Sequence, residues 1–305
     1  DGSVFATIRC EVLPVASGCA PGTVTAVDRA EDSGGGSITV ATGSEDLKLD
    51  TLHTLDGRNA FREGLWIVKG ARLVTPDEEM MRRLGALHQE VAGHESFWAR
   101  RLEALEQPEL PHVQPDKAWS AAPSFAPVRV ELPRKALASL AAATGASSAS
   151  EAALAAFCAF VARAGGSRAF DVGYSEPSLR RKTDGCANLF ASIVPLRVEM
   201  RDGQPFESFL KSRKAELELI RRHKTYALDL AARYPHLRGA AAKLPGKSWT
   251  VAAELVEELP GTAEGQRIHL HGPVNLLVDQ GGTGCLLIHD TEAVSAGDAA
   301  ALARQ

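Results

Sequence analysis

The sequence predicts an α+β protein, with a small β-barrel first and a mixed α/β layer in the remainder. Three observations lead to this fold class. Short strand-like runs fill residues 1–75, apolar residues recur at helical spacing over 78–105, and strand-like and helical patterns alternate over 128–305. A chain of 305 residues is long enough for two domains. We therefore expect three segments, namely 1–75, 76–127 and 128–305.

The first segment consists of short alternating or apolar runs, each bounded by turn-forming residues. The turns are marked by Ser17-Gly18, Pro21-Gly22, the run Ser33 to Gly36, and Thr42-Gly43. Several short strands at close spacing are typical of a small barrel. The expected strands are VFATIRCEVL, GTVTAVD, SITVAT, DLKLDTL and LWIVKGARLV.

The second segment combines one long predicted helix with a connector. The helix should run from Glu78 to about Leu105, because its apolar residues fall at steps of mostly three and four. His94 lies on the same stripe, where a hydrogen-bonded core or boundary histidine is favoured over a catalytic one. Residues 107–127 contain five prolines and little periodicity, which indicates an extended connector. The stripe is Met80, Leu84, Leu87, Val91, Trp98, Leu102 and Leu105.

The third segment alternates strands with helices, which predicts a mixed α/β layer. One helix should begin at Pro133 and end at Gly145, and Ser148 and Glu151 have the spacing of a capping box that opens a helix to about Val161. Further helices are expected over 205–222 and from about 295. The expected strands are VRVEL, AFDVGYS, SIVPLRVEM, SWTVAAELVEE, RIHLH, VNLLVD and GCLLIHD.

Composition narrows the functional classes. The five cysteines are scattered and never spaced as Cys-x-x-Cys, which argues against a zinc site or a disulfide framework. A net charge of −4 argues against a phosphate-binding surface. No apolar run is long enough to span a membrane, and the first residues are not typical of a targeting peptide. We therefore expect a cytoplasmic protein without membrane partners.

Residues 1–75 resemble the C-terminal barrel of the methionyl-tRNA formyltransferase family. The matching features are Pro21-Gly22-Thr23-Val24 and the tail LKLDTLHTLDGRNAFREGLWIVKGARL. That family's chemistry belongs to a preceding domain that binds formyl-tetrahydrofolate, and this resemblance does not include it. The segment has seven Lys/Arg and ten Asp/Glu, which argues against a nucleic-acid partner. Formyltransferase domains also occur at the start of some peptide synthetases, and that setting fits this chain better.

Residues from about 80 to 305 resemble the condensation domains of nonribosomal peptide synthetases, beginning after their N-terminal lobe. The resemblance implies a chloramphenicol-acetyltransferase-like α/β lobe. Four stretches match in the family's order: HESFWARRLEALEQPELP, DGCANLFASIVPLRV, RRHKTYALDLAARYP and GCLLIHDTEAVSAGDAAALARQ.

One departure from that family bears on catalysis. Condensation domains use a His-His-x-x-x-Asp-Gly motif, and this sequence contains no two adjacent histidines. His53, with Asp56 and Gly57, is one residue too short and lacks the first histidine, so it is not a candidate active site. The weak alternatives for a catalytic base are His223, His289 and His94, in that order. His269 and His271 share a strand face, but paired surface histidines are favoured over half of a metal site.

We therefore expect a noncatalytic linker in the starter region of a nonribosomal peptide synthetase, with no cofactor of its own. A parent synthetase would use formyl-tetrahydrofolate, ATP and phosphopantetheine, and the partners would be its formyltransferase, adenylation and carrier domains. One alternative is a standalone acyltransferase acting on carrier-bound thioesters. Another is a carrier-docking module that uses the basic residues Arg238, Lys243 and Lys247, although a solvated loop is the more usual role of such residues.

Overall fold

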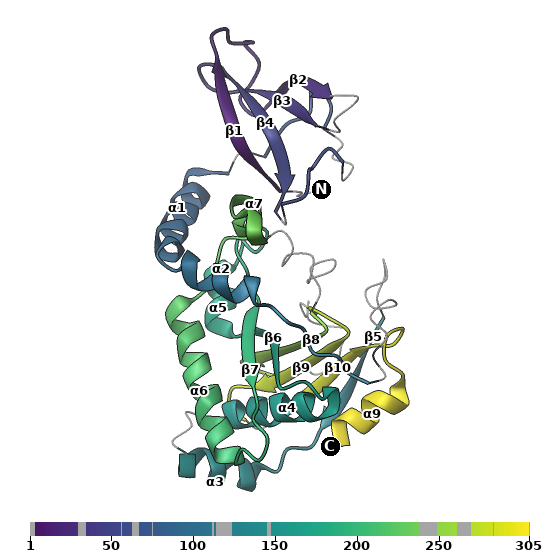
Figure 1. Cartoon of the computed structure of the whole chain (residues 1–305). Coiled ribbons are helices and arrows are strands. Elements are labelled where there is room, and N and C mark those ends of the chain that lie inside the picture. Colours follow the sequence, from purple (N-terminus) through teal and green to yellow (C-terminus); the bar gives the residue numbers. More distant parts are fainter. Residues whose placement is uncertain are drawn as a thin grey trace. The chain divides into compact units, whose positions relative to one another are not determined.

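The computed structural model describes residues 4–29, 35–55, 57–62, 67–74, 76–111, 113, 124–144, 148–237, 249–260, 270–282 and 284–304. The chain forms two compact units, and Figure 1 labels the elements of both. The first unit comprises Asp1–Glu103, Gly185–Phe190 and Tyr226–Ala242, and the second unit comprises Ala104–Asp184, Ala191–Thr225 and Lys243–Gln305. Each unit is thus assembled from segments that are far apart in the sequence. The boundaries expected at residues 75 and 127 stay predictions.

The first unit contains a four-stranded antiparallel sheet with the order β1-β4-β3-β2. Four of the five predicted strands are therefore confirmed. The strands are β1 (Phe5–Leu13), β2 (Val24–Arg29), β3 (Gly36–Ala41) and β4 (Asp46–Thr54).

The fifth predicted strand, LWIVKGARLV, does not form over its described part, residues 67–73. Gly70 has a φ of +88° and turns the chain, so this stretch borders β2 through only a few hydrogen bonds. The amide of Val24 donates to the carbonyl of Ala71 at 2.8 Å, and the amide of Gly70 donates to the carbonyl of Val24 at 2.8 Å. The described strands close no barrel, and the formyltransferase barrel remains a proposal.

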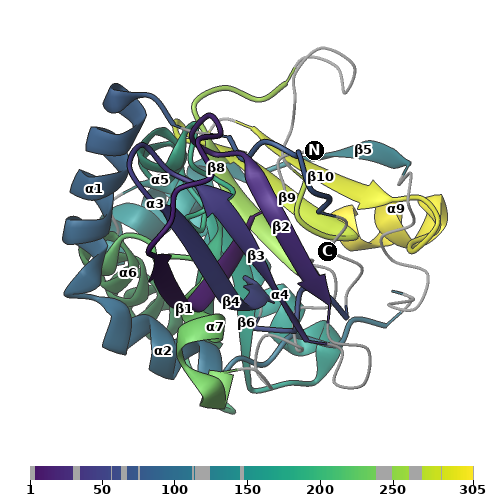
Figure 2. The same cartoon turned by 90° about the horizontal axis from the view of Figure 1, so that it is seen from above.

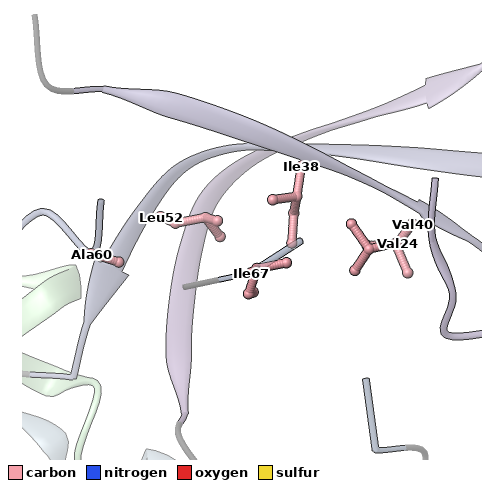
Figure 3. Close-up of a cluster of buried hydrophobic side chains, with 6 residues drawn as sticks. All are labelled: Val24, Ile38, Val40, Leu52, Ala60 and Ile67. Atoms are coloured by element: carbon pink, nitrogen blue, oxygen red, sulfur yellow. The ribbon is translucent and has the colours of Figure 1, made fainter. Parts of the chain in front are cut away.

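This sheet is held by a compact apolar cluster, drawn in Figure 3. Ile38 and Val40 alternate along β3, so both point to the same side of the sheet. Burial of a Val, Leu or Ile side chain contributes about 1.5–3 kcal/mol, which makes these residues the main source of stability for the sheet. The cluster consists of Val24, Ile38, Val40, Leu52, Ala60 and Ile67.

The single long helix predicted over 78–105 is wrong, because the structure has two helices there. They are α1 (Glu78–Ala92) and α2 (Glu95–Glu103). Gly93 ends α1, and the amide of His94 donates to the carbonyl of Val91, three residues back, which interrupts the regular four-residue ladder.

The predicted apolar stripe is therefore divided between two packing sites. Leu87 and Val91 of α1 pack with Cys186, Phe190 and Ala227. On α2, the ring of Trp98 lies 5.3 Å from the ring of Tyr226, and Trp98 is fully buried. The break between the helices lets each half of the stripe reach its own partners within the first unit.

The same unit ends in the short helix α7 (Leu230–Arg233) and the single turn η1 (Pro235–Leu237). Arg233 of α7 donates to Glu95 of α2 at 2.5 Å and to Asp229 at 3.1 Å. These charge-assisted bonds fasten α7 to the start of α2.

The second unit is built on a six-stranded sheet with the order β5-β10-β9-β8-β6-β7. Strand β8 runs parallel to both β6 and β9, whereas the other pairs are antiparallel, so the predicted mixed α/β layer is confirmed. Every residue of β9 and of β10 is buried, including the polar residues Asn275, Asp279, His289 and Asp290, and both strands lie in the interior of the sheet order. The strands are β5 (Phe125–Val130), β6 (Ala169–Ser175), β7 (Val194–Glu199), β8 (Val251–Val256), β9 (Val274–Asp279) and β10 (Cys285–Asp290).

The helices of this unit follow the prediction closely. Figure 2 shows them from a second direction. The hydroxyl of Ser148 caps α4 by accepting from the amide of Glu151 at 3.2 Å, but α4 runs four residues further than predicted and ends before Gly166, whose φ is +66°. Helix α5 was not predicted. The helices are α3 (Arg134–Thr144), α4 (Ala149–Gly165), α5 (Pro177–Thr183), α6 (Phe206–His223) and α9 (Ala296–Arg304).

The strand expected at RIHLH is not seen in its described part, because Leu270 and His271 belong to no strand. His271 instead lies in the turn into β9, where its amide donates to the side chain of Asn275 at 2.9 Å. His269 lies outside the described residues. The paired face expected for these two histidines therefore stays a prediction.

A buried carboxylate fixes the chain that enters this sheet. Asp171, in the middle of β6, is fully buried. Its carboxylate accepts from the amide of Glu106 at 3.0 Å and from the guanidinium of Arg197 on β7 at 2.9 Å. The amide of Asp171 donates to the carbonyl of Glu106 at 2.6 Å. The start of the connector is therefore bound to β6 by both main chain and side chain.

We expect Asp171→Ala to lower the free energy of unfolding by about 3 kcal/mol, because the amide of Glu106 and the partly buried guanidinium of Arg197 would lose their common acceptor. Urea denaturation followed by circular dichroism measures the change. The matched control is Asp202→Ala, which breaks an exposed pair with Arg168 and should change stability by less than about 1 kcal/mol. Equal effects in the two variants would contradict the role given to Asp171.

Candidate functional site

A polar cluster lies where β6 passes into α5, within the second unit. Pro177 starts α5, and Glu176 precedes it as the last residue in extended conformation. The Glu176 carboxylate accepts from the hydroxyl of Tyr174 at 2.8 Å, from the hydroxyl of Ser178, and from Nε of Arg221 at 3.2 Å. One carboxylate thus gathers side chains from a strand and two helices.

Arg221 joins this carboxylate to a second one. Its guanidinium also donates to Glu151 of α4 at 2.7 Å, and Glu151 is only 4% exposed. Burial lowers the pKa of Arg221, but the hydrogen bond to Glu151 and the charges around it raise the pKa above its ordinary value. Burial, together with the Glu176 charge, raises the pKa of Tyr174 well above its ordinary value, so this phenol stays protonated.

Glu176, Ser178 and Arg221 of this cluster border a cavity of about 210 Å³. Among the described residues, no histidine or cysteine lines the cavity, and the one hydroxyl in the lining, on Ser178, donates to Glu176. Lys224 has a φ of +59°, a conformation that costs an ordinary residue of the order of 1–3 kcal/mol. The arrangement can hold a small polar group by hydrogen bonds and charge, but it offers no activated nucleophile. The lining is Glu176, Ser178, Leu179, Lys182, Ile220, Arg221 and Lys224.

Two further ion pairs extend the cluster to β8. Arg180 of α5 binds Glu254 of β8 and also donates to the carbonyl of Leu255 at 3.0 Å. Burial raises the pKa of Glu254, and the Arg180 charge opposes this rise. Arg181 pairs with Glu257 at 2.5 Å on the surface. Together these pairs attach α5 to the end of β8.

A second cavity, of about 370 Å³, is lined mostly by apolar residues and lies between the sheet and its helices. Phe157 and Phe160 of α4 form one wall, and Cys285 and Leu287 of β10 lie on another. Burial raises the pKa of Cys285 to about 12. The thiol is therefore protonated at neutral pH, and this cavity offers apolar contact rather than chemistry.

The three candidate histidines lie on separate elements. His94 stands between α1 and α2, His223 is the last residue of α6, and His289 lies on β10. His289 is 1% exposed, and its Nδ1 lies 3.1 Å from the carbonyl of Val294. His223 lies in sequence between Arg221 and Lys224, which both line the polar cavity. It is therefore the candidate closest in sequence to that cavity.

The remaining predicted site residues lie elsewhere. Arg238, Lys243 and Lys247 fall outside the described residues, so the basic docking patch stays a prediction. His53 is buried in the sheet of the first unit, with Nδ1 3.1 Å from the carbonyl of Gly57.

In the described part of the chain, no group of three or more His, Cys, Asp or Glu side chains could hold a metal ion. No described helix is long and apolar enough to cross a membrane.

Comparison with known proteins identifies the family of part of each unit. The family model of the condensation domain matches residues 84–243, just over half of the chain. This chain belongs to the condensation domain family. No curated protein matches it.

A solved structure of similar fold matches most of this chain. The X-domain from teicoplanin biosynthesis has a TM-score of 0.54 and 16% identity, over 90% of this chain and 70% of that one. The first condensation domain of the calcium-dependent antibiotic synthetase has a TM-score of 0.47 and 14% identity, over 88% of this chain. This chain spans only 64% of that condensation domain. The cyclization-docking bidomain of EpoB from Sorangium cellulosum gives 0.46 and 16%, over 84% of this chain and 57% of the bidomain.

Sequence reasoning missed the polar cluster of this condensation domain. The charges of Glu151 and Arg221 were visible, but they lie 70 residues apart and look like an ordinary capping box and a basic helix end. A usable signal was the stretch Tyr174 to Ser178, where a buried strand ends in a tyrosine, a glutamate and a proline. Such a polar strand end before a helix indicates a site at a sheet edge.

We expect Arg221→Met to lower the free energy of unfolding by about 2 kcal/mol, because Glu151 and Glu176 would lose the cation between them. Urea denaturation followed by circular dichroism measures the change. The control is Arg222→Met, on the exposed side of α6, and equal losses of stability in the two variants would refute the pairing.

Thiol labelling gives a second expectation. Cys10 and Cys19 are exposed, whereas Cys158, Cys186 and Cys285 are buried. Burial raises the pKa of Cys158 and of Cys285 to about 12, so at pH about 8 roughly one such thiol in ten thousand is ionised. A colorimetric thiol reagent should therefore titrate two groups rapidly in the folded protein and five after denaturation. Rapid reaction of a third thiol would contradict the burial of Cys158, Cys186 and Cys285.

Proposed function

We propose that this condensation-family chain is a noncatalytic segment of the starter region of a nonribosomal peptide synthetase. It would position a formyltransferase domain relative to adenylation and carrier domains. The observation that carries the proposal is the family match over residues 84–243 in a sequence without two adjacent histidines. A condensation lobe without its usual histidine motif retains the shape of the domain but not its general base.

The geometry of the histidines supports this function. A general base must be able to reach the proton that it removes, within hydrogen-bond distance or through one water. His289 is buried, and its Nδ1 is engaged by the carbonyl of Val294. Glu176 and Arg221 are bonded mainly to one another and to neighbouring side chains, which suits a structural joint.

The proposal assigns each remaining role to a part of the parent synthetase. Residues 1–75 would be a formyltransferase-type barrel, 76–127 a helical and proline-rich connector, and 128–305 the C-terminal lobe of a truncated condensation domain. Formyl-tetrahydrofolate, ATP and phosphopantetheine would be bound by neighbouring domains of the same polypeptide. A carrier domain would dock on Arg238, Lys243 and Lys247, and the location would be the cytoplasm.

The test is an acyl-transfer assay with the purified chain. A carrier-bound acyl thioester and a carrier-bound aminoacyl thioester are the substrates, and a condensation domain that has the His-His-x-x-x-Asp-Gly motif is the positive control. We expect condensation no faster than the uncatalysed reaction, and no change in His223→Ala or His289→Ala. A rate above background that either substitution abolishes would overturn the proposal.

The assay also decides on the second candidate, an acyltransferase that uses a relocated base. His223 favours it, because it lies between two residues that line the 210 Å³ cavity, Arg221 and Lys224. The size of the native gene product adds an independent check. An antibody to this segment should detect a polypeptide well above 32.4 kDa in cell extract, and a band at 32.4 kDa would contradict a synthetase segment.

A further inference from the structure

Strand β1 forms one edge of the described sheet in the first unit. Among the described strands, β1 pairs only with β4, and it lies at the end of the sheet order. No main-chain hydrogen bond of β1 is described outside that ladder. A strand of nine residues with an open edge is long enough to template pairing with another strand, which most proteins prevent.

The side chains along this edge are exposed and carry opposite charges. Arg9, Cys10, Glu11 and Val12 are all exposed, and Val12 is 55% exposed. The register of β1 with β4 places Arg9 opposite Asp50 and Glu11 opposite Lys48. Opposite residues of an antiparallel pair lie on the same face of the sheet, so these four charges form one charged face.

We propose that β1 is a homodimerisation edge, and that it pairs antiparallel with β1 of a second copy in a register centred on Cys10. In this register Arg9 of one copy faces Glu11 of the other, and the same pair recurs on the opposite side of the two-fold axis. The charges then alternate across the four strands β4 and β1 of one copy and β1 and β4 of the other. The row consists of Asp50 and Arg9 of the first copy, followed by Glu11 and Lys48 of the second.

The neighbouring symmetric registers do not give this match. A pairing centred on Arg9 places two arginines face to face, and a pairing centred on Glu11 does the same with two glutamates. Like charges directly opposite are destabilising. If one strand slides by a single residue from any of these registers, the charged face of one sheet becomes continuous with the opposite face of its partner, which lacks this row of charges, and Arg9 and Glu11 no longer meet. The charge pattern therefore selects the register centred on Cys10, and a two-fold pairing suits a closed dimer.

Charge exchange on the full-length chain tests the proposal. Sedimentation velocity over a wide range of concentration should show a monomer–dimer equilibrium. Arg9→Glu and Glu11→Arg should each weaken the dimer about tenfold or more, because each substitution turns two attractive pairs into repulsive ones.

A mixture of the two variants should restore dimers. The Arg9→Glu chain then has two acidic side chains at these positions and the Glu11→Arg chain has two basic ones, so both facing pairs are attractive again. The control Glu45→Arg makes the same charge change as Glu11→Arg, but at an exposed turn beside β4, and should leave the dimer intact.

Thiol crosslinking tests the register itself. In a Cys19→Ala background, Cys10 is the one exposed thiol among the described cysteines, and a short thiol-specific crosslinker should yield covalent dimers. Cys10→Ala in the same background should abolish the crosslink without changing sedimentation. A monomer at every concentration, a dimer indifferent to both charge reversals, or a dimer without the Cys10 crosslink would each overturn the proposal.

Discussion

The fold of the second unit depends on one buried carboxylate. Asp171 stands in the middle of β6, which pairs antiparallel with β7 and parallel with β8. Its side chain joins the connector at Glu106 to Arg197 of β7, so three segments far apart in the sequence meet at one charge. A fully buried carboxylate is tolerated only when it is paired and hydrogen-bonded. The pairing of Asp171 attaches the connector at Glu106 to β6. It also holds β7, the edge strand of the sheet, beside β6.

The polar cluster at the end of β6 repeats this principle around two carboxylates. Arg221 lies between Glu151 and Glu176, and the three residues tie α6 to α4 and to the strand. Because Arg221 pairs with both carboxylates, the network forms a joint between these elements. The adjoining cavity and the strained Lys224 show that the joint is not perfectly packed.

Local patterns in the sequence predicted much of the fold. Alternation over SITVAT and the apolar run VNLLVD gave β3 and β9, and the Ser148 cap gave the start of α4, because short-range rules govern these features. The same rules failed at Gly93, where the apolar spacing continues although the helix ends. They also failed at α5, because a helix of seven residues is too short to show a periodic apolar pattern. The condensation-family resemblance is confirmed over residues 84–243, which contain three of its four motifs in order. The fifth predicted strand of the barrel did not form, because Gly70 has a positive φ and turns the chain there.

The sequence by itself determined where most strands and helices form, the resemblance to the family, and the lack of adjacent histidines. These features depend on residues that are neighbours in the chain, so periodicity and motif order reveal them. Only the tertiary structure decided that Glu151 and Arg221 meet, that His289 is buried, and that β1 lies at the edge of its sheet with Arg9 opposite Asp50. Each of these features depends on which elements become neighbours in space. Residues that are far apart in the chain meet only when it folds, so no local pattern in the sequence reveals them.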